Sequence, residues 1–334
     1  MAKPINIDDI LAHSVHLARL EGRGFRSFIA PSMAEALRDI RRLLADVDTI
    51  TSRRQLRAIE TAITSIVRDQ TGWAALTSEL DGLAMYENEF FTRLVGTGTT
   101  AAAAERVTKL ANNTMMVLRS GEQFNTGLWP DFARNNLESQ AQRVNNIVRT
   151  GYANGLTGRE MRGSISRLFD GILTREAEAL ARTGYAHYSS VGRQAFAQAN
   201  KDIIDREVPI ATFDSRTSET CVSISARYGQ KGWPVGESPI GYPPYHINCR
   251  TTIVPLAKGQ ELSGTRSSRG DQPGQIPANT TIDNFVKNQS ADFQNELLGR
   301  TRAQLFREGR LDLRSLTNAR MQPLTLDELR RRGI

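Results

Sequence analysis

Residues 211–256 read ATFDSRTSETCVSISARYGQKGWPVGESPIGYPPYHINCRTTIVPL and decide the fold of this chain. The stretch holds both cysteines of the chain, Cys221 and Cys249, and places His246 three residues before the second one. It is rich in Gly, Pro and Trp, whereas the flanking sequence has the apolar spacing of helices. Because it has few helix formers and three soft metal-ligand side chains, we expect a compact module that specific contacts hold together.

Short β-branched runs stand at both ends of this stretch. Residues 210–213 and 251–254 are rich in Ile, Thr and Val, which predicts two short strands paired in an antiparallel sheet. Between them, Pro243 and Pro244 restrict the backbone that leads to His246, and one of their peptide bonds is a candidate for the cis form.

Charged residues flank the cysteines. Asp214 and Arg216 are two positions apart, so on a strand they face the same side. They either bond each other or hold the long loop in place, with Arg250 as an alternative partner. We interpret these residues as a salt-bridged scaffold rather than a substrate site.

Cys221, His246 and Cys249 offer two thiolates and one imidazole, ligand types that suit Zn²⁺. A structural zinc site takes four protein ligands, and here Asp214 or a water would have to be the fourth. Other interpretations stay open: buried thiols beside a hydrogen-bonded histidine, a disulfide, and a nucleophilic cysteine paired with the imidazole. We favour a structural core, because no H-E-x-x-H and no H-x-E with P-C-x-x-C accompanies the cluster.

The order of these residues resembles the phage Mu F-like minor head proteins, also called phage head-morphogenesis proteins. The matching positions in the module are Asp214, Arg216, Thr217, Cys221, Gly232, Trp233, Pro234, Pro243, Pro244, His246, Cys249 and Arg250. Further matches are the G-L-T-G turn at 155–158, the A-R-T motif at 181–183 and LTLDEL at 324–329. The resemblance therefore covers residues 131–334.

Three positions depart from the pattern of that family. Ser218 stands where some members have the first Cys of a C-x-x-C, and Thr251 stands where some end in C-R-C. A four-cysteine zinc knuckle therefore cannot form in this chain. Gly184 occupies a position where members often have Glu, so any role of that carboxylate is lost.

Apolar residues at helical spacing dominate the sequence outside the module, as in residues 37–47, 56–66 and 73–83. We therefore predict an α+β fold that is predominantly α-helical. Its expected parts are an N-terminal helical bundle (1–130), a Mu F-like domain (131–256) with helices at 131–205 and an antiparallel β-rich Cys/His module at 206–256, a flexible polar linker or arm (257–281) and a helical C-terminal tail (282–334). His13 and His16, near the start of the chain, are expected on a helix surface, because no third metal ligand is near them in the sequence.

The chain has 334 residues and a formal net charge of +7, with most of its cations arginine. An arginine excess favours contact with DNA phosphates or with acidic protein surfaces, although solvated helix faces explain the same composition. No apolar run reaches the roughly 18 residues that a membrane helix needs.

The resemblance implies a structural minor capsid protein of a tailed bacteriophage rather than an enzyme. Such a protein lies in the capsid interior or at the portal vertex, in multiple copies, and aids head assembly, DNA packaging or genome ejection. Its implied partners are the portal protein, the major capsid protein and the double-stranded genome, held by phosphate contacts without sequence preference. It would be made in the host cytoplasm and have no membrane contact in the assembled particle.

Two other functions stay open at this point. The first is a metal- or thiol-dependent enzyme, of a hydrolase-like kind, built on Cys221, His246 and Cys249. The second is a sequence-independent DNA-binding protein, which the positive charge favours. No cofactor is expected apart from the zinc ion that the cluster is able to hold.

Overall fold

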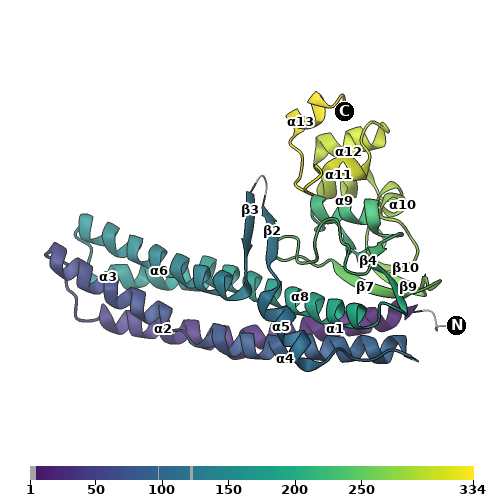
Figure 1. Cartoon of the computed structure of the whole chain (residues 1–334). Coiled ribbons are helices and arrows are strands. Elements are labelled where there is room, and N and C mark those ends of the chain that lie inside the picture. The colour runs from purple at the N-terminus through teal and green to yellow at the C-terminus, as the bar shows by residue number, and fades with distance from the viewer. Residues whose placement is uncertain (1–4, 97, 121–122) are drawn as a thin grey trace. The chain divides into compact units, whose positions relative to one another are not determined.

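A computed structural model of the chain describes residues 5–96, 98–120 and 123–334 (Figure 1). The chain is predominantly α-helical with small antiparallel sheets and a Cys/His cluster, so the predicted fold class is confirmed. The helices are α1 (Ile7–Gly24), α2 (Ala30–Leu43), α3 (Arg53–Arg68), α4 (Gly72–Val95), α5 (Ala104–Asn113), α6 (Trp129–Ala153), α7 (Gly158–Leu168), α8 (Thr174–Ala199), α9 (Glu219–Tyr228), α10 (Ile282–Lys287), α11 (Ala291–Leu298), α12 (Arg300–Arg307) and α13 (Leu326–Arg331). The strands are β1 (Ile5–Asn6), β2 (Met116–Ser120), β3 (Gln123–Gly127), β4 (Ile204–Ile210), β5 (Phe213–Asp214), β6 (Trp233–Pro234), β7 (Thr252–Ala257), β8 (Leu262–Ser263), β9 (Thr265–Arg269) and β10 (Gly274–Pro277).

The described residues form two compact units that do not follow the predicted domain boundaries. The first unit draws its residues from 1–17, 81–126 and 185–334, and the second from 18–80 and 127–184. Helices α1, α4 and α8 each contribute residues to both units, which is why a division at residue 130 does not describe the fold. Across the described part of the chain, no helix is both long and apolar enough to span a bilayer.

The second unit is helical, and its core follows the apolar spacing of the sequence. Ile59, Ile63 and Val67 of α3 are buried, and so are Val144 and Val148 of α6, which packs along α3 (Figure 1). Ion pairs flank this contact, including one between the Arg68 guanidinium and the Glu138 carboxylate at 2.7 Å. Helical periodicity thus predicted the buried face of α3 correctly.

Gly184 of α8 lies in the second unit, where α8 comes close to the Trp129 side chain of α6. A Cβ atom there would lie 2.6 Å from the ring of Trp129, which is almost fully buried. The Trp129 indole donates to the Thr77 hydroxyl at 2.8 Å and meets the Trp73 ring edge-on, with centroids 5.8 Å apart. Glycine at 184 is therefore required by packing, so a glutamate at this position would not fit.

The first unit contains a buried charge cluster that joins α1, α4 and α8. Glu87 has no exposed surface, and its carboxylate binds His13 Nε2 at 2.5 Å and Arg193 Nε at 2.7 Å. The His13 ring also stacks on Phe90, with centroids 3.7 Å apart. The prediction of a helix surface was therefore wrong for His13, because its partner lies on another helix far along the sequence; His16 is exposed.

The central sheet of the first unit has the strand order β6-β4-β7. β4 pairs with β7 in antiparallel register, with Ile210 opposite Thr252 and Val208 opposite Val254. The expected antiparallel pair is present, but β4 ends at Ile210 rather than continuing to Phe213. Phe213 instead belongs to β5, which pairs in parallel with β9.

The prediction of a flexible arm at 257–281 was wrong. β9 and β10 form an antiparallel hairpin in this segment, and β8 pairs with β1. The Arg266 side chain points inward, where its guanidinium lies 3.6 Å from the centroid of the Phe213 ring and donates to the Ala211 carbonyl. Gln260, Arg266 and Ser268 of this segment are thus buried in the fold, whereas Ser267, Arg269 and Gln275 are exposed.

The C-terminal segment is helical as predicted, but it packs against the module rather than forming a separate tail. One apolar core combines Phe213 and Val222 of the module with Phe293, Leu313 and other buried residues between Ile282 and Leu329. The Ser223 hydroxyl on α9 also bonds the Thr317 hydroxyl at 2.8 Å. The end of the chain therefore covers one face of α9.

We expect Gly184→Ala to lower the free energy of unfolding by about 1–3 kcal/mol, since the added methyl group overlaps the Trp129 ring. Gly82→Ala is the matched control, because Gly82 is also inside a helix and a Cβ there meets nothing within 4 Å. Better helix propensity should make this control more stable by roughly 0.5–1 kcal/mol. Urea unfolding followed by tryptophan fluorescence measures both changes. Equal stabilisation by the two alanines would contradict the close approach.

Candidate functional site

Two elements position the cysteines and the histidine. Ser218 caps α9, and its hydroxyl accepts from the Cys221 N–H at 3.2 Å, which places Cys221 in the first turn of the helix. His246 and Cys249 share one tight turn, in which the Cys249 N–H donates to the His246 carbonyl at 3.2 Å. The peptide bond between Pro243 and Pro244, two residues before His246, is cis.

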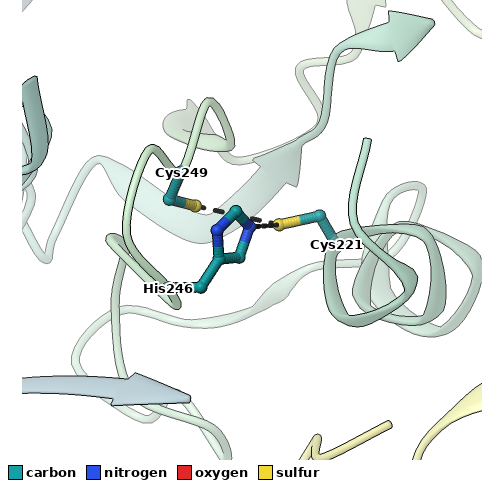
Figure 2. A group of neighbouring side chains, drawn as sticks. All are labelled: Cys221, His246 and Cys249. Atoms are coloured by element: carbon teal, nitrogen blue, oxygen red, sulfur yellow. Dashed lines mark hydrogen bonds between the residues drawn. The ribbon is translucent and has the colours of Figure 1, made fainter. Parts of the chain in front are cut away.

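The three side chains that the sequence singled out converge (Figure 2). Their ligand atoms all lie within 4.8 Å of one another. Cys221 Sγ is 3.2 Å from His246 Nε2 and 3.7 Å from Cys249 Sγ, so the cysteines are free thiols in this structure. The predicted cluster is therefore formed, although His246 stands 25 residues from Cys221 in the chain.

The imidazole of His246 is held in a defined orientation. Its Nδ1 lies 2.7 Å from the Ile247 carbonyl, an acceptor, so Nδ1 carries the proton. Nε2 then faces Cys221 Sγ and lies 2.8 Å from the Ser218 hydroxyl. The nitrogen that is free to accept a proton or bind a cation thus points at the sulfur atoms.

Charge interactions and hydrogen bonds shift the pKa values of the two thiols in opposite directions. Burial alone would raise the pKa of Cys249, but hydrogen bonds from Cys221 and His246 outweigh it and hold that pKa well below its usual value. The hydrogen bond to Cys249, together with burial, raises the pKa of Cys221 well above its usual value. Burial lowers the pKa of His246, whereas its bond to the Cys249 thiolate raises it, and the net shift is upward. The two shifts have opposite directions, so Cys249 ionises more readily than Cys221.

The surroundings of the sulfur atoms are apolar. Cys221 and Cys249 are 2% and 4% exposed, and they share a core with Ile224, Tyr245 and Ile253. Chemically, such a group of side chains can bind a soft metal ion, close a disulfide or supply a thiolate nucleophile. A nucleophile has to be reached by its substrate, whereas a metal site or a disulfide does not.

Asp214 is not part of the cluster, so of the two candidates for a fourth metal ligand, Asp214 and a water, the structure does not place Asp214 beside the sulfur atoms. Both of its carboxylate oxygens accept from Arg250, one of them from Nη2 at 2.7 Å. Asp214 also accepts from the Arg216 backbone N–H and from the Thr217 hydroxyl, each at 3.1 Å. Arg250, rather than the exposed Arg216 side chain, is thus the ionic partner that closes the loop.

The remaining motif residues are packing residues. Trp233 is 4% exposed and lies in the same core as the cysteines, with its ring edge-on to Tyr228 at 5.5 Å between centroids. Pro244 is the second residue of the cis bond. These positions support the loop that carries His246 rather than contributing chemistry of their own.

Arg119 of β2 supports the site from a distant part of the sequence. Its guanidinium donates to the carbonyls of Arg320 and Ile240, each at 2.9 Å, and its backbone N–H donates to the Tyr245 carbonyl at 2.8 Å. The sequence contains no signal for this role, because Arg119 follows a helix in a segment without a motif. Ser218 was identifiable in principle, since Ser three residues before Cys221 is a helix-cap pattern.

No family model matches the chain, and no curated protein or solved structure gives a match. The resemblance to Mu F-like minor head proteins therefore rests on the motif residues alone.

We expect Asp214→Asn to lower the free energy of unfolding at pH 7 by about 2 kcal/mol, since the Arg250 guanidinium loses its charged acceptor. Burial raises the pKa of Asp214, but Arg250 outweighs this and keeps it below its usual value. A lowered pKa stabilises the folded state above the pKa of the unfolded chain, about 3.9, and this contribution is lost as the pH falls through the folded value.

The difference between wild type and Asp214→Asn should therefore be full at neutral pH and should shrink below about pH 4. Urea unfolding at several pH values measures it, with Asp202→Asn, at an exposed carboxylate, as the matched control. A difference that stays constant down to pH 3 would show that the ion pair is not its cause.

Proposed function

We propose that this chain is a minor head protein of a tailed bacteriophage, which acts at the portal vertex or inside the head through non-covalent contacts. The observation that carries the proposal is the run of motif residues from Asp214 to Arg250. These residues resemble the Mu F-like pattern in order, and in the structure they bond or pack on one another within a single module. We assign these residues a structural role, that of stabilising the module, which suits a structural protein of a particle.

The helical faces supply the surfaces for partners. Arg53, Arg54 and Arg57 at the start of α3 are exposed, and the chain as a whole carries a net charge of +7. Arginine side chains of this kind bind phosphate oxygens without reading bases, which suits contact with a packaged genome. Because β8, β9 and β10 take up much of residues 257–281, the contacts to portal or capsid are assigned to helix faces rather than to an extended arm.

The proposal is tested in the phage or prophage that encodes the chain. Purified particles should contain the protein in a few copies, measured by quantitative mass spectrometry against the portal protein. An amber mutation in its gene should reduce the yield of infectious, DNA-filled heads, and expression of the wild-type chain in trans should restore it. Cross-linking of purified heads should join the chain to the portal or major capsid protein.

Three results would overturn this proposal. One is a chain that is absent from particles whose amber mutant gives a normal yield of infectious heads. Another is tight duplex binding by the purified chain, steeply weakened by salt, without enrichment in heads, which would identify a free-standing DNA-binding protein. Turnover of a substrate that Cys249→Ala abolishes while the fold is retained would instead identify an enzyme.

A further inference from the structure

We propose that Cys221, His246 and Cys249 bind one Zn²⁺ ion, with an oxygen ligand on the side of Ser218 in the fourth position. The ion would connect the first turn of α9 to the turn that carries His246 and Cys249 (Figure 2). This site does not depend on a role in the phage head, because it follows from the geometry of the cluster alone.

The distances match those of a tetrahedral zinc site. Two sulfur atoms that each lie about 2.3 Å from zinc at the tetrahedral angle are about 3.8 Å apart, and a sulfur and an imidazole nitrogen are about 3.5 Å apart. In the structure, the two sulfur atoms are separated by 3.7 Å, and Cys221 Sγ lies 3.2 Å from His246 Nε2. Two of the three distances between ligand atoms are therefore within a few tenths of an ångström of those in a zinc site, and all the ligand atoms lie within 4.8 Å of one another.

The orientation of the histidine is that of a metal ligand. Zinc-bound histidines usually donate their second ring N–H to a carbonyl or carboxylate, which fixes the ring and directs the other nitrogen at the metal. His246 Nδ1 is 2.7 Å from the Ile247 carbonyl, and Nε2 faces the sulfur of Cys221. The ring is thus already in place before an ion binds.

The fourth ligand position of the proposed zinc site faces the hydroxyl oxygen of Ser218. The Ser218 hydroxyl lies 2.8 Å from His246 Nε2 and caps the helix that carries Cys221. Asp214 is excluded from this position because Arg250 occupies both of its carboxylate oxygens. The donor set is therefore two sulfurs, one nitrogen and one oxygen, which zinc accepts.

Charge also favours a divalent cation in this core. Two buried thiolates would carry two negative charges, and burial of such charge without compensation is costly. A single Zn²⁺ ion neutralises both within bonding distance.

The test uses the full chain, expressed without a histidine tag in medium that contains zinc. Elemental analysis should find about one zinc ion per chain. Exchange for Co²⁺ should give the thiolate charge-transfer and d–d absorption bands of a tetrahedral site. A zinc chelator should lower the melting temperature, and added zinc should restore it. Zinc should also slow the reaction of both cysteines with a thiol reagent by at least about tenfold.

Cys249→Ser and His246→Ala should each reduce zinc affinity by at least about tenfold, whereas His16→Ala should retain full zinc content. His16 is the matched control because it is an exposed histidine outside the cluster. If a cluster variant does not fold, the cobalt spectrum and the chelator response of the wild-type chain still decide the matter. Wild-type protein that contains no zinc, and that gives no thiolate bands with Co²⁺, would overturn the site.

Discussion

The pairing of β4 with β7 is the constraint on which the rest of the module depends. The chain leaves β4 at Ile210 and enters β7 at Thr252, which stand opposite each other, and between them it returns to the sheet once, at β6. Everything between them is therefore a closed loop, and both cysteines, the histidine and Asp214 lie within it. The entropy cost of closing a loop rises only slowly with its length, so one short ladder is able to hold a long excursion in place.

Within that loop, α9 is the element that the other parts pack around. Cys221 and Ile224 belong to the core of the cysteine cluster, while Val222 belongs to the core built by the C-terminal helices. The helix is thus buried on two sides, as a hydrophobic stripe on each face requires. Its Ser218 cap satisfies the first N–H groups and, at the same time, contacts His246. Local helix formation and assembly of the site therefore use the same side chain.

Much of this arrangement was predictable from local pattern. Apolar spacing identified the buried face of α3, and the isolated Cys and His residues identified the cluster. These features depend on residues a few positions apart, or on chemistry that is rare in the chain. Prediction from the sequence succeeded where the residues of a single helix or short segment are enough to define the feature.

The errors share a physical cause, which is that the deciding partner is distant in the sequence. His13 is buried because Glu87 comes from another helix, and Arg266 is buried because Phe213 offers a ring to stack on. From the sequence alone, a polar residue is predicted to be exposed, because the group that would form its hydrogen bond or ion pair in the core is not yet known. The same applies to Asp214, for which Arg216 is the nearer arginine in the chain and Arg250 the nearer one in space.

The position of Met321 has a consequence for how the protein is made. This residue lies in the core around the two cysteines, and its carbonyl accepts from the Thr220 hydroxyl on α9. During translation, the strands and α9 leave the ribosome long before the segment that completes their core. The module therefore reaches its native packing only after Met321 has left the ribosome, and until then one flank of α9 is open to chaperones and to premature association.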